Sequence, residues 1–256
     1  MIDLIESNRK SSKIAIIDRD KEFSYKELGN ISNSYFKYLK IRTIVLIIGE
    51  NSLEIISFYI ACLHQEVIPL FLNEAIPMNY LRNYISALRP TNIFSKKKLN
   101  FSNIQKVNAF GEYNLYFLTG KKIISDKAPS ILLTTSGSTG NPKLVKVTKK
   151  NLISNTKSIC KYLAIDDRSK HITTLPISYT YGLSCVNTHL HSGGTIIINN
   201  ESLISRRFWD LVKKTTPSTM AGVPYTYEML FKLGLNRVNL SSIKKFTQAG
   251  GKLSDT

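Results

Sequence analysis

A ten-residue run of glycine, hydroxyl-bearing and small residues is the part of this sequence best equipped for chemistry. It reads Thr-Thr-Ser-Gly-Ser-Thr-Gly-Asn-Pro-Lys over residues 134–143. Glycines let a backbone approach a phosphate closely, and successive N–H groups form an anion-binding concavity. Serine and threonine hydroxyls add donors at little bulk, and a lysine adds a positive charge. The run therefore predicts a loop that binds the phosphates of a nucleotide.

This loop differs from the common nucleotide-binding and hydrolase motifs. A Walker A loop ends in Gly-Lys-Ser/Thr, but here Pro142 precedes Lys143 and Leu144 follows it. The sequence also contains no G-x-G-x-x-G fingerprint and no G-x-S-x-G nucleophile elbow. A Ser/Gly turn that binds nothing is the alternative. The length of the run and its Pro-Lys end favour phosphate binding.

The cysteines and histidines do not have the spacing of a metal or redox site. Cys62, Cys160 and Cys185 lie far apart among apolar neighbours, which predicts buried free thiols. His189 and His191 are the only close pair of histidines, and their surroundings have a helical pattern. Residues two apart share a face in a strand and not in a helix. We therefore expect structural or surface histidines and no metal site.

The chain is strongly basic, with 35 Lys and Arg against 18 Asp and Glu and a formal net charge of +17. Such a charge can indicate nucleic-acid or membrane-surface binding. The lysines are scattered in short groups over different expected elements, and no basic stripe interleaved with aromatics emerges. We favour a compositional bias over nucleic-acid binding, which stays an alternative. The charge would also suit an anionic substrate such as a nucleotide.

The length and composition fit a globular α/β protein. The chain has 256 residues and is 43% hydrophobic, which allows one large domain or two smaller ones. The best apolar run, residues 44–48, is far too short to span a bilayer. The first ten residues lack the apolar core of a signal peptide. We expect a soluble, cytoplasmic protein.

Strand-like and helix-like patterns alternate along the chain. Strands are expected at residues 14–18, 43–48, 67–70, 92–95, 114–118, 131–135, 144–148, 195–198, 218–221 and 245–248. Helices are expected after a capping box at Ser24 and Glu27, and at 53–63, 79–88, 150–163, 206–213 and 224–233. The alternation predicts an α/β fold of layered, parallel-rich sheets flanked by helices. The polar stretch 96–129 is expected to connect two α/β lobes, roughly 1–129 and 130–256.

The loop closely resembles the signature of the adenylate-forming superfamily, which includes acyl- and aryl-CoA synthetases, luciferases and the adenylation domains of nonribosomal peptide synthetases. Further segments resemble other motifs of the family in the same order, at residues 23–28, 175–182, 222–227 and 248–253. In the family these are the opening Thr/Ser-Tyr-x-Glu-Leu motif, a Leu-Pro-x-x-His-x-x-Gly segment, a Gly-Val-Pro segment beside the acyl pocket and a Gly-Gly segment beside adenine. The resemblance covers essentially the whole chain and implies part of the N-terminal domain of an AMP-binding enzyme.

The resemblance implies roles for the matched residues. The residues that would hold or approach the phosphates are Thr135, Ser136, Gly137, Ser138, Thr139, Gly140 and Lys143. Tyr179, Gly222 and Pro224 would border the acyl site. Gly250 and Gly251 would lie against the adenine. A core aromatic and a strand-to-helix turn are an equally good interpretation of the acyl-site residues, and a plain loop is the alternative for the two glycines.

The implied reaction joins a carboxylate to AMP. A carboxylate oxygen attacks the α-phosphorus of ATP, pyrophosphate leaves, and the acyl group then passes to a thiol of coenzyme A or of an acyl or peptidyl carrier protein. ATP and Mg²⁺ are the expected cofactors, and a carboxylic acid is the expected substrate. The protein's task would be to position the reactants and to neutralise charge on the phosphate oxygens.

The sequence also departs from the family pattern. Leu144 replaces the usual glycine after Pro-Lys, Lys149 stands where histidine is common, and Tyr179 replaces a frequent histidine. Later segments of the family, with a metal-binding glutamate and a C-terminal subdomain that carries a catalytic lysine, have no counterpart before Thr256. We therefore expect the N-terminal fragment of an AMP-forming ligase. A truncated, non-catalytic ATP- or acyl-binding module and a basic nucleic-acid-binding protein remain alternatives.

Overall fold

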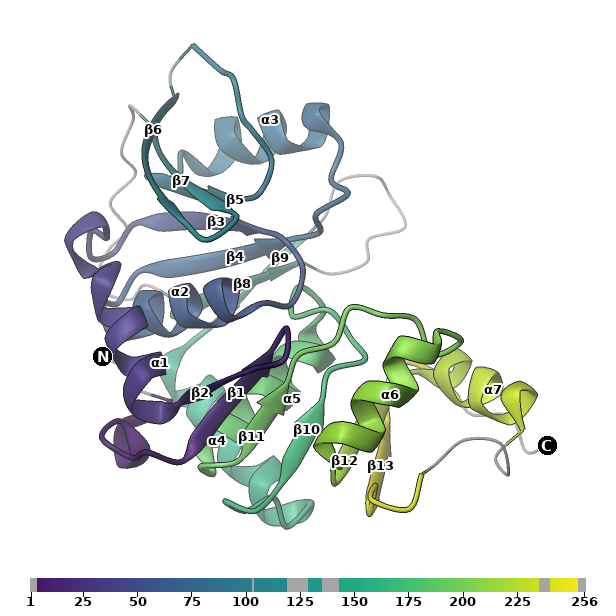
Figure 1. The fold of residues 1–256 in the computed structure, drawn as a ribbon. Helices are drawn as coiled ribbons and strands as arrows, with labels where there is room; N and C mark the ends of the chain where they lie inside the picture. The colour runs from purple at the N-terminus through teal and green to yellow at the C-terminus, as the bar shows by residue number, and fades with distance from the viewer. Residues whose placement is uncertain (1–3, 103, 119–128, 135–142, 235–239, 253–256) are drawn as a thin grey trace. The chain divides into compact units, whose positions relative to one another are not determined.

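A computed structural model describes residues 4–102, 104–118, 129–134, 143–234 and 240–252 (Figure 1). Its residues group into two units, which interleave along the chain. One unit contains Gly29–Asn155, and the other combines Leu4–Leu28 with Thr156–Thr256. The first residues of the chain therefore group with its C-terminal part. The lobes expected from the sequence, 1–129 and 130–256, stay a prediction.

The first unit contains a sheet whose described strands run in the order β6-β7-β5-β3-β4-β8-β9. Their bounds are β3 Ile44–Ile48, β4 Ile68–Leu72, β5 Asn92–Ser95, β6 Ile104–Phe110, β7 Tyr113–Leu118, β8 Ile131–Thr134 and β9 Leu144–Val147. Strands β5, β3, β4 and β8 are parallel to one another, and antiparallel strands flank them. This arrangement confirms the parallel-rich sheet that the sequence predicts.

Helices α2 (Leu53–His64) and α3 (Met78–Leu88) cover opposite faces of this sheet (Figure 1). Two consecutive residues of β5 contact the helices on the two faces. Ile93 joins an apolar cluster with Leu81 of α3, while Phe94 stacks on Phe58 of α2 at a centroid distance of 4.3 Å. Because side chains alternate along a strand, a buried parallel strand needs apolar residues on both faces. That requirement explains why β3 is continuously apolar.

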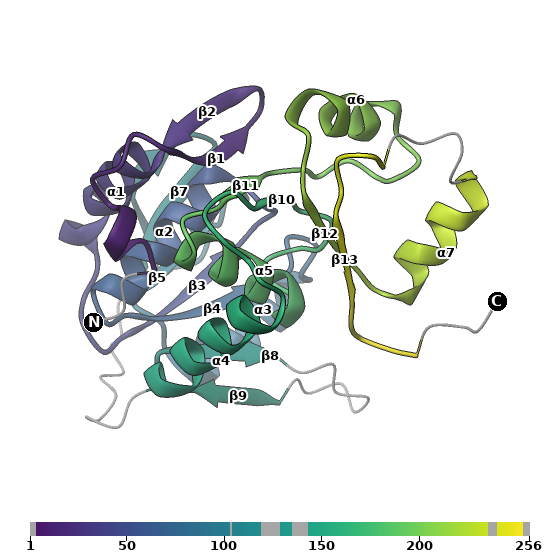
Figure 2. The ribbon, with the colours of Figure 1, turned by 90° about the horizontal axis from the view of Figure 1, so that it is seen from below.

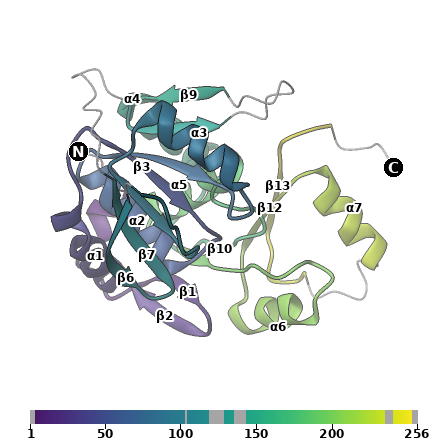
Figure 3. The same cartoon turned by 90° about the horizontal axis from the view of Figure 1, so that it is seen from above.

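The second unit contains a sheet with the described strand order β13-β12-β10-β11-β1-β2, in which β2 is the antiparallel member. The bounds are β1 Ile14–Asp18, β2 Lys21–Ser24, β10 Lys170–Ile172, β11 Thr195–Ile197, β12 Thr219–Gly222 and β13 Lys245–Gln248. Helices α5 (Thr180–His191) and α6 (Arg206–Thr215) lie on opposite sides of β10 and β12 (Figures 2 and 3). Phe208 of α6 and Leu230 of α7 (Pro224–Leu233) pack in one cluster with Met220 of β12.

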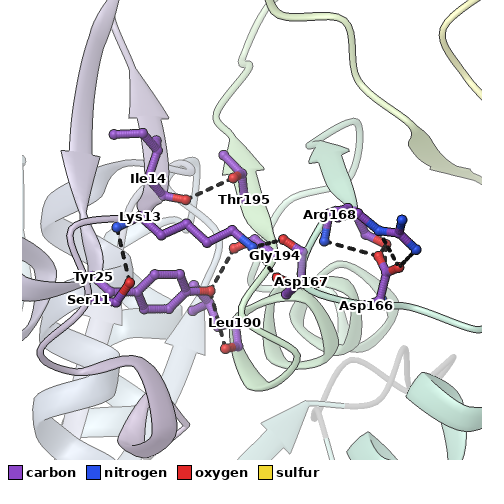
Figure 4. Close-up of polar contacts among 11 residues, drawn as sticks. Ser11, Lys13, Ile14, Tyr25, Asp166, Asp167, Arg168, Leu190, Gly194 and Thr195 are labelled. Atoms are coloured by element: carbon purple, nitrogen blue, oxygen red, sulfur yellow. Dashed lines mark hydrogen bonds and ion pairs between the residues drawn. The ribbon is translucent and has the colours of Figure 1, made fainter.

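Strand β1 is held to the C-terminal part of the second unit by side-chain contacts (Figure 4). The buried Tyr25 hydroxyl donates to the carbonyl oxygen of Gly194 over 2.6 Å. Thr195 Oγ1 donates to the carbonyl oxygen of Ile14 over 2.8 Å, and Lys13 pairs with Asp167 over 2.9 Å. These contacts, together with the parallel pairing of β1 and β11, explain why the first residues belong to this unit.

Helices α1 (Tyr25–Ser34) and α4 (Lys149–Tyr162) contain the points at which the chain passes between the units. The capping box at the start of α1 is confirmed. Glu27 Oε2 accepts from the Ser24 N–H over 2.7 Å, and Ser24 Oγ accepts from the Glu27 N–H over 3.2 Å. Pro224 is also confirmed as the first residue of its helix, where its missing N–H costs nothing.

The sequence did not predict three strands, β2, β6 and β10, of which β6 has seven residues. The expectation that residues 96–129 hold a single strand in a connecting stretch was wrong, because β6 pairs with β7 as a hairpin. Only part of β6 is shielded from solvent, so its polar residues hide the strand pattern. The hairpin turns at Gly111, whose φ of 57° is favourable for glycine.

Two remaining expectations concern thiols and membranes. Cys62 and Cys185 are buried free thiols, as expected, whereas Cys160 is only half-buried and its Sγ lies 3.2 Å from Ser192 Oγ. Across the described ranges, none of the helices combines the length and the apolar character needed to cross a bilayer.

Candidate functional site

The predicted phosphate loop joins β8 to β9 in the first unit. Thr134, the last residue of β8, pairs with Leu144, the first residue of β9. The antiparallel pairing therefore brings the two ends of the loop side by side. Lys143 lies exposed at the start of β9. The other residues expected to contact the phosphates lie outside the described residues, and they are Thr135, Ser136, Gly137, Ser138, Thr139 and Gly140.

The remaining predicted site residues come together in the second unit, where β12 and β13 end. These strands are parallel and paired in register, with Gly222 opposite Gln248. Pro224 starts α7 directly after β12, and Gly250 follows β13. Ligands of open α/β sheets bind outside the carboxyl ends of parallel strands. The chain therefore places these residues at the edge where a ligand site is expected.

Gly250 and Gly251 contact the expected acyl-site residues directly. Gly250 has a φ of 94°, and a Cβ atom at this position would lie 2.6 Å from the Tyr179 hydroxyl oxygen. A Cβ atom at Gly251 would lie 3.2 Å from Cγ of Pro224. Any larger residue at Gly250 would be strained in its backbone and would displace the tyrosine. The residues expected beside adenine and those expected beside the acyl group thus form one continuous cluster.

Gly222 has a structural reason to be glycine. A Cβ atom there would lie 2.8 Å from Thr226 Cβ and 2.9 Å from Tyr227 Cε2. The first turn of α7 therefore closes directly on the end of β12, and Thr226 Oγ1 accepts from the Val223 N–H over 3.2 Å. A strand-to-helix turn explains Gly222 without any ligand. Tyr179, by contrast, is 38% exposed and is not a core aromatic.

Two further tyrosines belong to the cluster and were not predicted as site residues. The Tyr181 hydroxyl donates to Thr247 Oγ1 over 2.6 Å, and the Tyr227 hydroxyl donates to the carbonyl oxygen of the same threonine. Burial raises the pKa of both phenols, so they remain neutral donors at physiological pH. Both lie inside segments that resembled family motifs. The presence of a tyrosine inside each of these two motif-like segments was the sequence feature that could have identified them.

Two helices begin at this edge of the sheet. Tyr179 stands at the N-cap position of α5, and Val223 stands at the N-cap position of α7. The first N–H groups of a helix lack intrahelical acceptors, and the helix dipole is positive at this end. The edge therefore combines helix N–H donors with aromatic side chains, and the Tyr179 hydroxyl packs directly against Gly250.

Metal ligands do not cluster in the described part of the chain. In those ranges no group of three or more His, Cys, Asp or Glu side chains could hold a metal ion.

Several lysines have structural partners that account for part of the positive charge. Lys245 Nζ donates to the carbonyl oxygen of Ala164, which follows α4, and Lys170 Nζ donates to that of Thr215 at the end of α6. Lys214 pairs with Asp20 over 2.6 Å. Cations near a helix C-terminus stabilise its free carbonyl groups. These lysines serve the fold, which weakens the argument from charge to nucleic-acid binding.

Known proteins resemble the chain along its whole length. The Escherichia coli (strain K12) enterobactin synthase component E is 21% identical over 295 residues, which cover 100% of this chain and 54% of that protein. A 2-succinylbenzoate–CoA ligase of Staphylococcus epidermidis is 23% identical over 255 residues, covering 97% and 52%. The chain therefore spans about half the length of these curated relatives.

A solved structure shares the fold. The o-succinylbenzoate CoA synthetase (MenE) of Bacillus subtilis, in complex with the acyl-adenylate intermediate OSB-AMP, superposes with a TM-score of 0.81. It is 18% identical, and the match covers 98% of this chain and 69% of that one. The α/β architecture with two helix-flanked sheets is thus an adenylate-forming fold. Residues 6–256 match the family described as AMP-binding enzyme, and the chain belongs to that family.

Proposed function

We propose that this chain is the N-terminal part of an AMP-forming acid–thiol ligase, which activates a carboxylate with ATP and passes the acyl group to a thiol. The observation that carries the proposal is the contact of Tyr179 and Pro224 with Gly250 and Gly251 at the carboxyl ends of parallel strands. This cluster occurs in a chain that matches the family over residues 6–256. The family match supports the proposed chemistry, and the cluster supports the proposed place of the site.

The loop between β8 and β9 is proposed to bind the phosphates of ATP. Its hydroxyls, glycine N–H groups and Lys143 are donors suited to β- and γ-phosphate oxygens. The proposal gives this role to Thr135, Ser136, Gly137, Ser138, Thr139, Gly140 and Lys143. Mg²⁺ bound to the nucleotide would neutralise further phosphate charge. No protein ligand of the metal is assigned.

The edge formed by β12 and β13 is proposed to bind the acyl-adenylate. Gly250 and Gly251, which pack beside Tyr179 and Pro224, would lie against the adenine. Tyr179, Gly222 and Pro224 would border the acyl group on the same side. Holding carboxylate and α-phosphorus in line converts a bimolecular encounter into an oriented reaction. This positioning is the contribution proposed for the chain's own residues.

The acceptor is proposed to be a thiol. Relatives include a 2-succinylbenzoate–CoA ligase and a D-alanine–D-alanyl carrier protein ligase, whose names give coenzyme A and a carrier protein as acceptors. Both acceptors present a thiol to the acyl-adenylate. The proposed acceptor is therefore a thiol, and the proposed substrate is a carboxylic acid.

Calorimetry with MgATP tests the proposal on the chain itself. We expect measurable binding, and Lys143→Ala should weaken it at least fivefold because one phosphate contact is lost. Lys146→Ala is the matched control, since Lys146 is exposed in β9, outside the loop. Equal affinity of the wild type and both variants, or no binding at all, would contradict the role of the loop.

Pyrophosphate exchange distinguishes a ligase from a binding module. Exchange of labelled pyrophosphate into ATP with a panel of carboxylates is expected from the ligase when its remaining segments are present. Binding of ATP without exchange under those conditions would support the non-catalytic module. A steep salt dependence of binding to duplex or single-stranded DNA would instead support the nucleic-acid alternative.

A further inference from the structure

Two buried histidines and a threonine form a hydrogen-bonded chain beneath α5. His189 of α5 lies with its Nε2 2.9 Å from Thr219 Oγ1 of β12, and the same hydroxyl lies 3.2 Å from Nδ1 of His171 in β10. The two imidazole rings stack with their centroids 4.7 Å apart. His171 and His189 are each 3% exposed, and Thr219 is 6% exposed. Three elements of the second unit therefore meet in one polar contact.

The geometry fixes where each proton lies. His189 Nδ1 is 2.8 Å from the carbonyl oxygen of Cys185, which can only accept, so this nitrogen carries the hydrogen. The Nε2 atom of the neutral ring must then accept, and the Thr219 hydroxyl donates to it. The threonine oxygen in turn accepts from His171 Nδ1. The Thr219 hydroxyl also lies 3.4 Å from the carbonyl oxygen of Lys170, a longer and weaker contact than the 2.9 Å to His189 Nε2. Every donor in this network has an acceptor without an additional proton.

The surroundings oppose the charged form of both rings. Burial, opposed in part by the hydrogen bond to the Cys185 carbonyl and assisted by the charge of Lys245, lowers the pKa of His189 to about 4. Burial and the adjacent His189 hold the pKa of His171 well below its usual range. The thiol of Cys185 also stays neutral, because burial raises its pKa to about 12. Among the described groups that act on the two imidazoles there is no carboxylate to compensate a positive charge.

The hydrogen-bonded network of His171, Thr219 and His189 connects to the candidate site through α5. The helix spans Thr180–His191, a length of about 18 Å. Its C-terminal half is bound to β12 through His189, and its first turn is bound to β13 through Tyr181 and Thr247. Tyr179, at the N-cap position, lies against Gly250. The orientation of α5 therefore determines where these tyrosines lie.

We propose that His171, Thr219 and His189 are positioning residues for the candidate site. When both imidazoles are neutral, the hydrogen bonds among the three residues attach α5 to β10 and β12. They thereby hold Tyr179 and Tyr181 at the strand ends. One additional proton turns His189 Nε2 from a hydrogen-bond acceptor into a donor. This new N–H then points at the Thr219 hydroxyl, which can no longer donate to the ring and already accepts from His171. The added charge is buried beside a second imidazole and near Lys245. Proton uptake therefore unseats α5 from the sheet.

Hydrogen exchange by mass spectrometry tests this without a nucleotide, so its outcome is independent of the proposed function. After correction for intrinsic rates, exchange of amides 180–191 should rise at least tenfold between pH 7 and pH 4.5. Amides of α2, in the other unit, serve as the internal reference. In His189→Gln the side-chain amide can still accept from Thr219 but does not titrate, so the rise should shrink to the part due to the remaining histidines. His191→Gln, on the same helix, removes a half-buried histidine whose pKa is also lowered by burial, and it should leave most of the rise in place.

Thr219 supplies a second, independent variant pair. Thr219→Val keeps the shape but removes the donor to the neutral His189, so the rise should begin at higher pH. Thr219→Ser keeps the hydroxyl and should keep the wild-type onset. Nitrogen-15 NMR of the four histidines should show two Nδ1–H neutral rings that persist below pH 5. A protonated His171 or His189 at pH 7, an unchanged onset in Thr219→Val, or a rise in His189→Gln as large as that of the wild type would overturn the proposal.

Discussion

The two units hold helices on their sheets by different means. In the first unit α2 packs through aromatic rings, with Phe58 stacked on Phe94 and Phe94 stacked on Tyr113 at 5.1 Å. In the second unit α5 also buries Leu183, Val186 and Leu190, and it adds the buried hydrogen bonds of His189 and Tyr181. Apolar contacts are non-directional and carry no proton, whereas a buried hydrogen-bonded chain is directional and responds to protonation. The ring-packed contact should therefore tolerate acid, while the polar one should orient site residues and depend on pH.

Removal of a ring from the first unit should have the largest effect. Phe94 is fully buried and contacts Tyr35, Phe58 and Tyr113. Phe94→Ala leaves a cavity in this stack, and we expect a loss of about 3–5 kcal/mol in the free energy of unfolding. Denaturant unfolding followed by exchange of the α2 amides measures it. Phe117→Ala, at a half-exposed site on β7, is the control and should cost far less.

Acid should destabilise the second unit through its histidines. The pKa of His189 is about 4 in the folded chain and about 6.5 when exposed, so the unfolded state binds more protons between these values. Stability contributed by the neutral ring is complete above pH 6.5 and falls as the pH drops toward 4, by about 3 kcal/mol in total. His171 acts in the same direction.

Denaturant unfolding at pH 7, 5.5 and 4.5 measures this dependence. Glu27 and Asp166 also have lowered pKa values, but their contributions are lost only below the ordinary carboxyl range. The difference between the wild type and His189→Gln isolates the histidine. A wild-type stability that does not change between pH 7 and 4.5 would contradict the comparison of the two units.

A substitution at Gly250 tests how much the contact between Gly250 and Tyr179 contributes to the free energy of unfolding. Gly250→Ala combines a φ of 94° with a contact of 2.6 Å to the Tyr179 hydroxyl, and we expect a loss of about 2 kcal/mol. Tyr179→Phe in the same chain should recover the part due to the hydroxyl but not the part due to φ. Gly251→Ala, where φ is not positive and the nearest atom is 3.2 Å away, is the matched control. Additive effects of Gly250→Ala and Tyr179→Phe would argue against the contact.

The smallest effect is expected from one hydrogen bond of α5. Tyr181→Phe removes the donor to Thr247 Oγ1, which should cost about 1 kcal/mol. Tyr225→Phe is the control, because that ring is 63% exposed. Thermal unfolding of the two variants would show the difference. Equal melting temperatures would mean that the bond does not contribute to seating the helix.

Local signals in the sequence predicted much of the fold. The Ser24–Glu27 capping box and Pro224 at a helix start are local features that the structure confirms. Two of the three strands that were not predicted were missed for different reasons. The three residues of β10 are too few to show a period, and β6 is a partly exposed strand with polar residues at the edge of its sheet. The grouping of residues 4–28 with the C-terminal part depends on tertiary contacts such as that of Tyr25 with Gly194, which no local pattern encodes.

The candidate site was predictable to the extent that its residues lie in recognisable motifs. Tyr179, Pro224, Gly250 and Gly251 were named from the sequence, and the structure brings them into contact. Their roles toward a ligand stay predictions. The pairing of His171 with His189 was not predictable, because β10 itself was not expected and the two residues are joined through Thr219 of a third element. Side-chain networks between elements follow from packing and not from spacing.

A hydrogen-exchange footprint of MgATP on the wild-type chain tests the central claim most directly. The account predicts protection in two separate places, namely the amides at the ends of β8 and β9 and those that follow β12 and β13, including Gly250 and Gly251. Addition of an acyl-adenylate analogue should extend the protection to the first turn of α5. No protection at either place under saturating MgATP, or protection confined to other lysine-rich segments, would contradict it.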